Sequence, residues 1–142
     1  MSIERTNHAS GAPWEAIVGY SRAVRVGRHV HVAGTTASDG EGGVLHRGDP
    51  EGQTREILRR ITDALAALGA APRHVVRTRI YVTDIGRWEA VARAHGDLFT
   101  NVRPAATMVQ VQRLIHEHML VEIEAEAYVH DDAAPSSREA GA

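Results

Sequence analysis

The chain has 142 residues, of which 43% are hydrophobic and 24% charged, as is typical of one soluble globular domain. It contains no cysteine, which excludes disulfides, thiolate nucleophiles and cysteine-ligated metal clusters. The formal net charge of -2 provides no strong field for nucleic acid or an anionic membrane surface, so we expect neither as a partner.

The N-terminal segment is polar and contains no apolar stretch like that of a signal peptide. No later apolar run approaches the roughly 18 residues that a membrane-spanning helix requires. We therefore expect a cytoplasmic protein. Residues 1–20 also lack hydrophobic periodicity, so we expect them to be irregular.

Two short alternating segments follow, over residues 21–26 and 29–35, and only Gly27 and Arg28 separate them. This spacing predicts a β-hairpin. Residues 37–49 are rich in glycine and aspartate, and their composition predicts a loop.

Over residues 53–68 the hydrophobic period changes to that of a helix. The charged side chains lie on one face, and the opposite face is apolar, with Ile57, Ile61, Ala64, Leu65 and Leu68. The pattern predicts an amphipathic helix that ends at Gly69. A second helix is predicted after Asp84, a suitable N-cap, with its apolar stripe between residues 88 and 99.

Three further strands are predicted over residues 75–82, 106–112 and 119–129, with Pro104 ending the second helical segment. The order β-β-α-β-α-β-β predicts an α+β domain over residues 1–130, with a single sheet and two helices on one face. Residues 131–142 are small and polar, and we expect a disordered tail.

The last strand alternates between two kinds of face. Its apolar positions fit under the helices, whereas Glu122, Glu124 and Glu126 share the other face with Leu120. Met108 on the preceding strand is expected on that same outer face. Apolar side chains there suggest a second burial partner, and another subunit is a candidate.

Residues 103–127 (RPAATMVQVQRLIHEHMLVEIEAEA) resemble the C-terminal signature of the RidA/YjgF family, a Pro-Ala-Arg-Ser/Thr strand, a Leu-containing turn and a Val-Glu-Ile-Glu-Ala strand. Residues 19–37 (GYSRAVRVGRHVHVAGTTA) resemble its Gly-Pro-Tyr-Ser start and first hairpin. Gln53, the Leu-Gly-Ala turn at residues 68–70 and the strand VVRTRIYVTDI also match. The similarity extends over roughly residues 18–129.

The resemblance implies a chorismate-mutase-like α+β subunit that forms a homotrimer, with small-molecule clefts at the subunit interfaces. The best-known members hydrolyse reactive enamines and imines of small amino acids to a 2-keto acid and ammonia, without a cofactor. Some members have been described as ribonucleases, but the near-neutral charge and the few aromatic residues of this chain argue against that activity here.

In those members a glutamate on the last strand orients the attacking water, and a tyrosine and backbone groups of the first hairpin complete the cleft. Matched by position, the catalytic glutamate is Glu122 and the tyrosine is Tyr20. Gly34 and Thr35 stand at the backbone-contact position, and Thr107 matches the small hydroxyl residue that follows the family's substrate-binding arginine.

The family's substrate-binding arginine is replaced by Ala106. A guanidinium holds a carboxylate through two charge-assisted bonds worth about 1.5–3 kcal/mol each, so its loss is expected to weaken binding about 10²- to 10⁴-fold. Arg103 is the nearest replacement, although strand alternation would turn it away from Ala106. Without it, Ala106 and Met108 leave that end of the cleft apolar, which suits a larger or less charged ligand.

Other interpretations of these residues stay open. On pattern alone Glu122 is a solvated side chain like its neighbours, and Tyr20 packs at an interface. Pairs of histidines occur at residues 29 and 31 and at residues 116 and 118, but no zinc motif accompanies them, so we expect no metal. His95 lies on an apolar helix stripe, as a hydrogen-bonded core histidine does.

Two functions therefore remain. One is a Rid-like hydrolase of an enamine or imine with a non-standard substrate. The other is a non-catalytic trimer of the same family that binds a small metabolite or assists another enzyme.

Overall fold

The computed structural model describes residues 3–131. Its elements are, in chain order, β1 (Arg5–His8), α1 (Pro13–Val18), β2 (Ala23–Val26), β3 (His29–Thr35), α2 (Pro50–Ala67), η1 (Pro72–His74), β4 (Val75–Val82), η2 (Ile85–Arg87), α3 (Trp88–Phe99), β5 (Ala105–Gln110) and β6 (Val121–Tyr128). The two η elements are single 3₁₀ turns.

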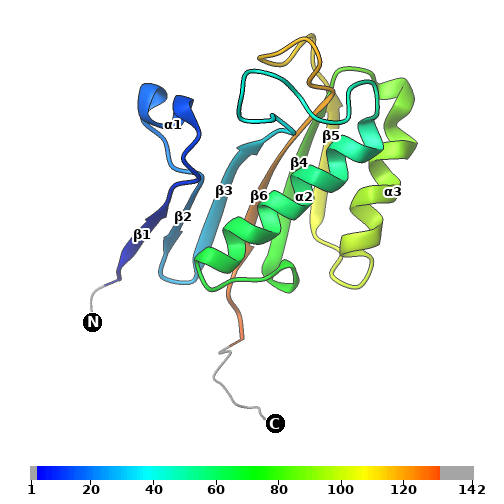
Figure 1. Cartoon of the computed structure of the whole chain (residues 1–142). Helices are drawn as coiled ribbons and strands as arrows, with labels where there is room; N and C mark the ends of the chain where they lie inside the picture. The colour runs from blue at the N-terminus through cyan, green and yellow to red at the C-terminus, as the bar shows by residue number, and fades with distance from the viewer. Residues whose placement is uncertain (1–2, 132–142) are drawn as a thin grey trace.

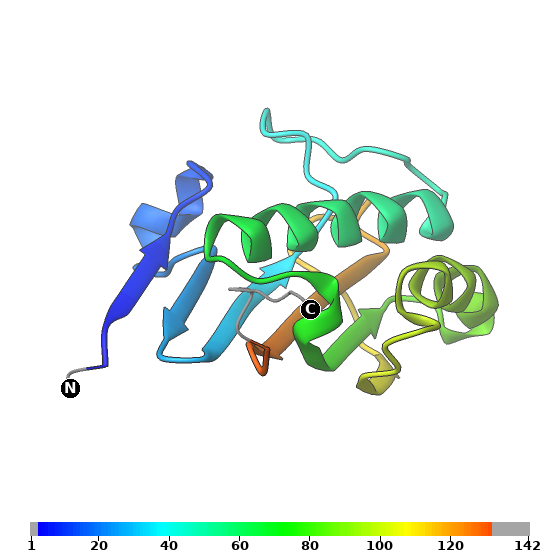
Figure 2. The same cartoon turned by 90° about the horizontal axis from the view of Figure 1, so that it is seen from below.

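The strands form one six-stranded sheet in the order β1-β2-β3-β6-β4-β5. Only β4 and β5 run parallel, with α3 as the crossover between them, and the other pairs are antiparallel. Helices α2 and α3 pack on one face of this sheet (Figures 1 and 2). The predicted α+β class, with a single sheet and helices on one face, is confirmed.

The expectation of an irregular N-terminus was wrong. Residues 5–8 form the edge strand β1, which pairs with β2, and α1 follows it at this end of the sheet (Figure 1). The sequence of β1, Arg-Thr-Asn-His, has no apolar alternation because the strand is almost wholly exposed. Helix α1 has only six residues and no side-chain cap, so hydrophobic periodicity cannot reveal it.

The other boundaries shift by a few residues. Helix α2 begins at Pro50 rather than residue 53, because the Asp49 side chain accepts a hydrogen bond from the Gly52 N–H at 2.9 Å and caps the helix earlier. Asp84 caps the short turn η2, and α3 starts only at Trp88. Strand β5 ends at Gln110, two residues before the predicted end.

The core lies between the sheet and the two long helices. As predicted, alternate residues of β6 are buried beneath the helices, from Val121 to Ala127. His95 of α3 is hydrogen-bonded to Thr78 at 3.0 Å, as expected of a core histidine, and burial lowers the pKa of its ring. No helix within residues 3–131 is both long and apolar enough to cross a membrane.

The expected positions of Met108 and Leu120 need correction. Both pack against the helix-side core rather than on the outer face of the sheet. Met108 pairs with Ile80 of β4, and neighbouring paired residues point to the same face. Leu120 precedes β6, and its N–H donates to the buried Gln53 side chain at 2.8 Å.

The outer face of β4 and β6 is therefore charged rather than apolar. Arg79 donates to Glu126 at 2.8 Å and lies 3.4 Å from Glu124, and the Tyr81 hydroxyl donates to Glu124 at 2.7 Å. The predicted disordered tail begins with one described residue, Asp131, which is ion-paired with Arg73 at 2.9 Å. The remainder of that tail lies outside the described residues.

Candidate functional site

Glu122 differs from the other two glutamates of β6. Its side chain is half-buried, and it makes no hydrogen bond or ion pair within the described part of the chain, whereas Glu124 and Glu126 are held by Arg79. Burial raises the pKa of the Glu122 carboxyl, the nearby charge of Arg22 opposes that rise, and Glu124 adds to it. Glu122 is thus a poorly hydrated acid with free oxygens.

Gly34 forms the surface against which this carboxylate rests. The β3–β6 register shifts between Val32 and Thr35, so that β3 has one more residue than β6 opposite it. This bulge brings the Gly34 backbone close to Glu122, and a Cβ built on Gly34 would lie 2.1 Å from Glu122 Oε2. Because glycine has no side chain, the Glu122 carboxylate can occupy this position, and any other residue at 34 would displace it.

Arg22 organises the hairpin on which the carboxylate rests, and the sequence interpretation missed it. Its Nη1 donates to the Gly34 carbonyl at 2.8 Å and to Thr35 Oγ1 at 2.9 Å. Its Nη2 donates to the Tyr20 hydroxyl at 3.1 Å. One buried guanidinium therefore joins three predicted site residues, Tyr20, Gly34 and Thr35.

Thr35 and Tyr20 contribute hydroxyl groups at this end of the sheet. Thr35 is buried, and its Oγ1 also donates to the Ala33 carbonyl at 2.8 Å. Tyr20 is half-buried, and its ring centroid lies 5.5 Å from the guanidinium carbon of Arg22. The contact is of the cation–π type.

Helix α1 holds Arg22 from the opposite side. Glu15 Oε2 lies 3.7 Å from Arg22 Nε, and both side chains are buried. Glu15 in turn accepts hydrogen bonds from the Ser10 N–H, at 3.1 Å, and from the Ser10 hydroxyl. Burial raises the pKa of Glu15, but the hydrogen bonds from Ser10 and the charge of Arg22 lower it below its usual value.

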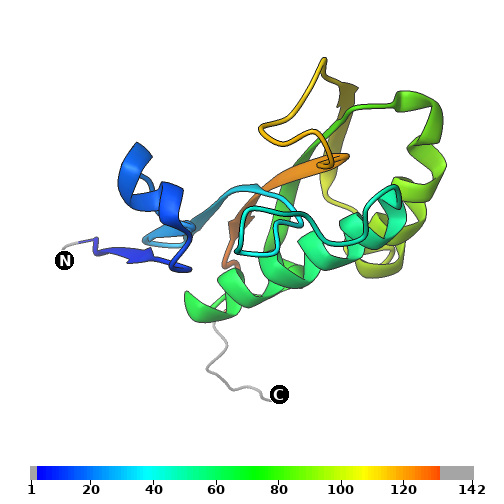
Figure 3. The ribbon, with the colours of Figure 1, turned by 45° about the horizontal axis from the view of Figure 1, so that its top comes forward.

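Two loops close this end of the sheet, residues 36–49 and residues 111–120, and Figure 3 shows them side by side. Gln53 joins them, because its Nε2 donates to the His46 carbonyl at 3.2 Å and to the His118 carbonyl at 2.9 Å. The side chain of Gln53 is fully buried. Its role is therefore to fix the loops.

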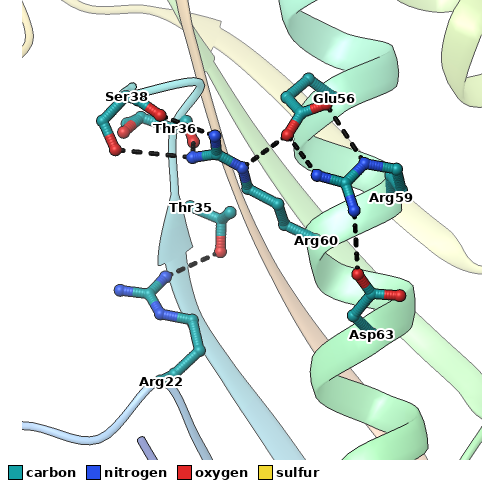
Figure 4. Close-up of polar contacts among 8 residues, drawn as sticks. All are labelled: Arg22, Thr35, Thr36, Ser38, Glu56, Arg59, Arg60 and Asp63. Atoms are coloured by element: carbon teal, nitrogen blue, oxygen red, sulfur yellow. Dashed lines mark hydrogen bonds and ion pairs between the residues drawn. The ribbon is translucent and has the colours of Figure 1, made fainter. Parts of the chain in front are cut away.

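Arg60 of α2 holds the chain just after Thr35 (Figure 4). Its guanidinium donates to the Thr36 carbonyl at 2.8 Å and to the Ser38 carbonyl at 2.6 Å, and it is paired with Glu56 at 2.8 Å. The segment that leaves β3 is thus attached to the helix layer.

The other predicted site residues lie on β5 or just before it, away from Glu122. Across the sheet Glu122 pairs with Tyr81, and Tyr81 pairs with Val109. Ala106 stands three residues before Val109, which is about 10 Å along β5, and the two strand spacings add about 10 Å sideways. Ala106 also pairs with the buried Thr78, so it points to the helix face, opposite Glu122.

Two further predicted site residues, Thr107 on β5 and Arg103 just before it, do not approach Glu122 either. Thr107 lies on the outer face, where its hydroxyl accepts a hydrogen bond from Arg77 at 2.8 Å. Arg103 has a left-handed backbone, with φ of 56°, and its Nε donates to the Thr100 carbonyl at the end of α3. One subunit brings together Glu122, Tyr20, Gly34 and Thr35, and leaves Arg103, Ala106, Thr107 and Met108 at the sheet edge.

The histidine pairs do not form a metal centre in the part of the chain that the structure describes. Within residues 3–131, no three side chains of histidine, aspartate or glutamate converge as metal ligands would.

Comparison with known protein families establishes the family to which the chain belongs. Residues 10–129 match the sequence model of Endoribonuclease L-PSP, the family of the RidA and YjgF proteins. The chain belongs to this RidA/YjgF family. The motifs that suggested the resemblance lie within the matched residues.

Individual RidA/YjgF relatives agree with this assignment. A Mycobacterium tuberculosis protein described as a member of the YjgF/YER057c/UK114 family has a structure with a TM-score of 0.81 and 52% identity, and the match covers 89% of this chain and 100% of that one. An uncharacterized Streptomyces coelicolor protein is 42% identical over 120 residues, 84% of this chain and 88% of that one. The 3-aminoacrylate deaminase RutC of Acinetobacter baylyi is 31% identical over 110 residues, 78% of this chain and 86% of that one.

Arg22 had one signal in the sequence. It stands two positions after Tyr20 within the quoted RidA/YjgF hairpin motif, in a chain whose expected arginine position is Ala106. A charged residue at the start of a strand is ordinarily solvated, so nothing in the sequence indicates that this one is buried.

Proposed function

We propose that this chain is a Rid-like hydrolase, or deaminase, of a reactive enamine or imine metabolite. The observation that supports this most directly is the half-buried Glu122 carboxylate, which has no hydrogen-bond or ion-pair partner among residues 3–131 and rests on the Gly34 backbone. A base with a raised pKa and free oxygens can accept a proton from water. The reaction class is taken from a relative named as a 3-aminoacrylate deaminase.

In the proposed reaction Glu122 orients a water molecule and takes one of its protons as the oxygen attacks the C=N carbon. Glu122 passes this proton to the nitrogen of the resulting carbinolamine, the C–N bond breaks, and ammonia leaves while the hydroxyl gives its proton to Glu122 and the C=O bond forms. Glu122 gives up that proton to complete the cycle, so one water is consumed and no electrons are exchanged. The chemistry requires no cofactor and no metal.

We further propose that the cleft is completed by a second copy in a cytoplasmic homotrimer. Ala106 and Glu122 lie on opposite faces and about 10 Å apart along the strands, so a shared cleft needs the β5 edge of a neighbouring subunit. Thr107 and Met108 would come with that edge. Arg77 on the outer face has an enclosed Nε without a hydrogen-bond partner in the described part of the chain, a group that an adjacent subunit could satisfy.

The substrate is proposed to be non-standard because Ala106 offers no donor to a small carboxylate. Arg103 is held at the end of α3, and its exposed side chain could reach a ligand only in a neighbouring subunit's cleft. The relative from Acinetobacter is named for 3-aminoacrylate, and that enamine belongs in the first panel of compounds. We expect weak or no turnover of 2-iminopropanoate by the wild-type chain.

A steady-state assay with enzymically generated 2-iminopropanoate tests the proposal. Ala106→Arg should raise its hydrolysis by at least about tenfold, the effect of one charge-assisted hydrogen bond, and adding Glu122→Gln should abolish the gain. Ala105→Arg is the matched control, because Ala105 is exposed on the same strand but points to the other face. Wild-type turnover at ordinary family rates would contradict the non-standard substrate.

The second candidate is a non-catalytic trimer that binds a small metabolite, and the missing arginine at Ala106 favours it. If Ala106→Arg gains binding of the 2-keto acid pyruvate but no hydrolysis, this candidate replaces the first. If the gain in hydrolysis requires Glu122, the machinery for positioning water is intact and the hydrolase stands.

A further inference from the structure

Arg22 supplies a buried positive charge in a site whose customary arginine position is Ala106. An obvious interpretation is that Arg22 takes over the task of holding a substrate carboxylate. The hydrogen bonds of its guanidinium decide against this, because a bidentate grip needs two free N–H groups side by side.

A guanidinium has five N–H groups. Both on Nη1 are used, by the Gly34 carbonyl and by Thr35 Oγ1, and one on Nη2 is used by the Tyr20 hydroxyl. The Nε–H faces Glu15, whose carboxylate lies 3.7 Å away. Only one N–H of Nη2 has no partner in the described structure, too few for a carboxylate fork.

We infer that Arg22 is a positioning residue that fixes Tyr20 and the Gly34 and Thr35 backbone around Glu122, and that it serves as the fixed positive charge facing the Glu122 carboxylate. The partners come from three parts of the chain: α1, the start of the hairpin and the β3 bulge. Arg22 therefore holds in one place the surface on which Glu122 rests.

The charged and titratable groups around Glu122 support the inference that Arg22 is the fixed positive charge facing this carboxylate. Arg22 is the cation that acts on it, Glu124 of the same strand acts in the opposite sense, and Tyr81 of β4 is hydrogen-bonded to Glu124. Burial raises the pKa of Glu122, and Arg22 limits that rise. Glu15 balances part of the Arg22 charge on the far side.

Two substitutions separate the charge from the geometry. Arg22→Gln removes the positive charge, so the Glu122 midpoint should move to higher pH. Arg22→Lys keeps the charge but cannot donate to Tyr20, Gly34 and Thr35 in the same fork, so its midpoint should stay nearer the wild-type value. Arg25→Gln is the matched control, because it removes one positive charge from the same hairpin, where Arg25 bonds to the Leu68 carbonyl.

The experiment is a pH titration of ¹³C-glutamate-labelled protein by carboxyl NMR, with Glu122 assigned through Glu122→Gln. An upward shift in Arg22→Gln that is absent in Arg25→Gln supports the inference. An unchanged midpoint, or an equal shift in both variants, would overturn it.

Wild-type protein provides a test that does not depend on the variants folding. The Nη protons of Arg22 should give separate, slowly exchanging NMR signals, because rotation about its guanidinium bonds is hindered by three acceptors. A single averaged signal, as from a solvated arginine, would contradict the positioning role.

The inference rests on the proposed function in one respect, which is that the proposed function makes Glu122 the catalytic base. The titration needs no substrate, so its outcome is independent of the hydrolysis assay. A shifted midpoint in a chain that hydrolyses nothing would leave the role of Arg22 intact and remove the hydrolase.

Discussion

Gly34 shows how a single residue can set the position of a functional group that is distant in the sequence and lies on a neighbouring strand. It lies at the β-bulge of β3, and any Cβ there would overlap the Glu122 carboxylate. That carboxylate is the end of a flexible side chain, which can swing into solvent with little strain. Substitution at Gly34 should therefore disturb the site more than the fold.

Gly34→Ala is expected to change the free energy of unfolding by less than about 1 kcal/mol while displacing Glu122 into water. Loss of burial should return the Glu122 pKa toward its usual value, and the proposed hydrolysis should be lost. Urea unfolding and the carboxyl NMR titration measure the two effects.

Gly96→Ala in α3 is the control, because nothing lies within 4 Å of a Cβ at that position. It should stabilise the helix by up to about 1 kcal/mol and leave Glu122 unchanged. An unaltered Glu122 midpoint in Gly34→Ala would show that the carboxylate does not rest where the structure has it.

The raised pKa of Glu122 also predicts a pH-dependent stability. Below the usual pKa of 4.5 the Glu122 carboxyl is protonated in both the folded and the unfolded state, and its contribution to the free energy of unfolding is fully present. As the pH rises through the higher folded-state pKa, the unfolded state has already released its proton, so stability is lost. The wild type should therefore lose stability relative to Glu122→Gln between pH 4.5 and the folded-state pKa.

Glu126→Gln should show the opposite pH dependence. The free energy of unfolding of the wild type and of both variants is measured by urea unfolding as a function of pH. The hydrogen bond from Arg79 lowers the pKa of Glu126, so its contribution is present above the usual 4.5 and is lost as the pH falls through the folded-state pKa. If both differences changed with pH in the same direction, the assignment of Glu122 as the poorly hydrated acid would be wrong.

Helix α2 is the element that fixes the surroundings of the site. Its first turn bonds both loops through Gln53, and its middle holds the exit of β3 through Arg60 (Figure 4). These bonds end on backbone carbonyls, and each bond from a charged donor is worth about 1.5–3 kcal/mol. Helix and loops should therefore unfold together.

Arg60→Met should lower the free energy of unfolding by about 3–6 kcal/mol, since two carbonyls each lose a bond from a charged donor. It should also speed amide hydrogen exchange over residues 36–38. Arg59→Met is the matched control one residue away. The Arg59 side chain is 60% exposed and, within residues 3–131, its ion pairs are those with Glu56 and Asp63. That change should cost less than about 1 kcal/mol, and equal costs would contradict the anchoring role.

Elements were predictable where the chain buries one face. The apolar spacing of α2 and the alternation of β6 follow directly from packing against a single core. Strand β1 and helix α1 escaped prediction because they bury little: Ile17 of α1 is 82% exposed and Val18 is 71% exposed. Their local sequences do not predict the tertiary contacts that hold them in place, such as the Glu15–Arg22 ion pair.

The outer sheet face is the surface on which a second copy would pack in the proposed homotrimer. It carries ion pairs rather than the expected apolar patch, yet Val109 is 43% exposed on it and Arg77 Nε has no hydrogen-bond partner among the residues that the structure describes. A face with these features fits contact with a second copy better than it fits bulk water.

Sedimentation velocity should accordingly give a trimer. Val109→Lys, which places an unpaired charge on the outer face, should shift the population toward smaller species. Ala66→Lys adds the same charge to the exposed side of α2 and should leave the trimer intact. A stable monomer at micromolar concentration, or equal effects of the two variants, would contradict the proposed assembly.

The family, the α+β class, the main helices and strands, and the position of Glu122 on β6 could all be predicted from the sequence. One-sided burial produces a local hydrophobic period, and the order of the motifs identifies the family. The folded structure was needed to establish that Met108 and Leu120 face the core, that Arg22 is buried in the site, and that Ala106 and Glu122 lie on opposite faces. These outcomes depend on strand register, on the β3 bulge and on which strands become neighbours. Contacts between residues far apart in the chain fix all three, and no local pattern encodes them.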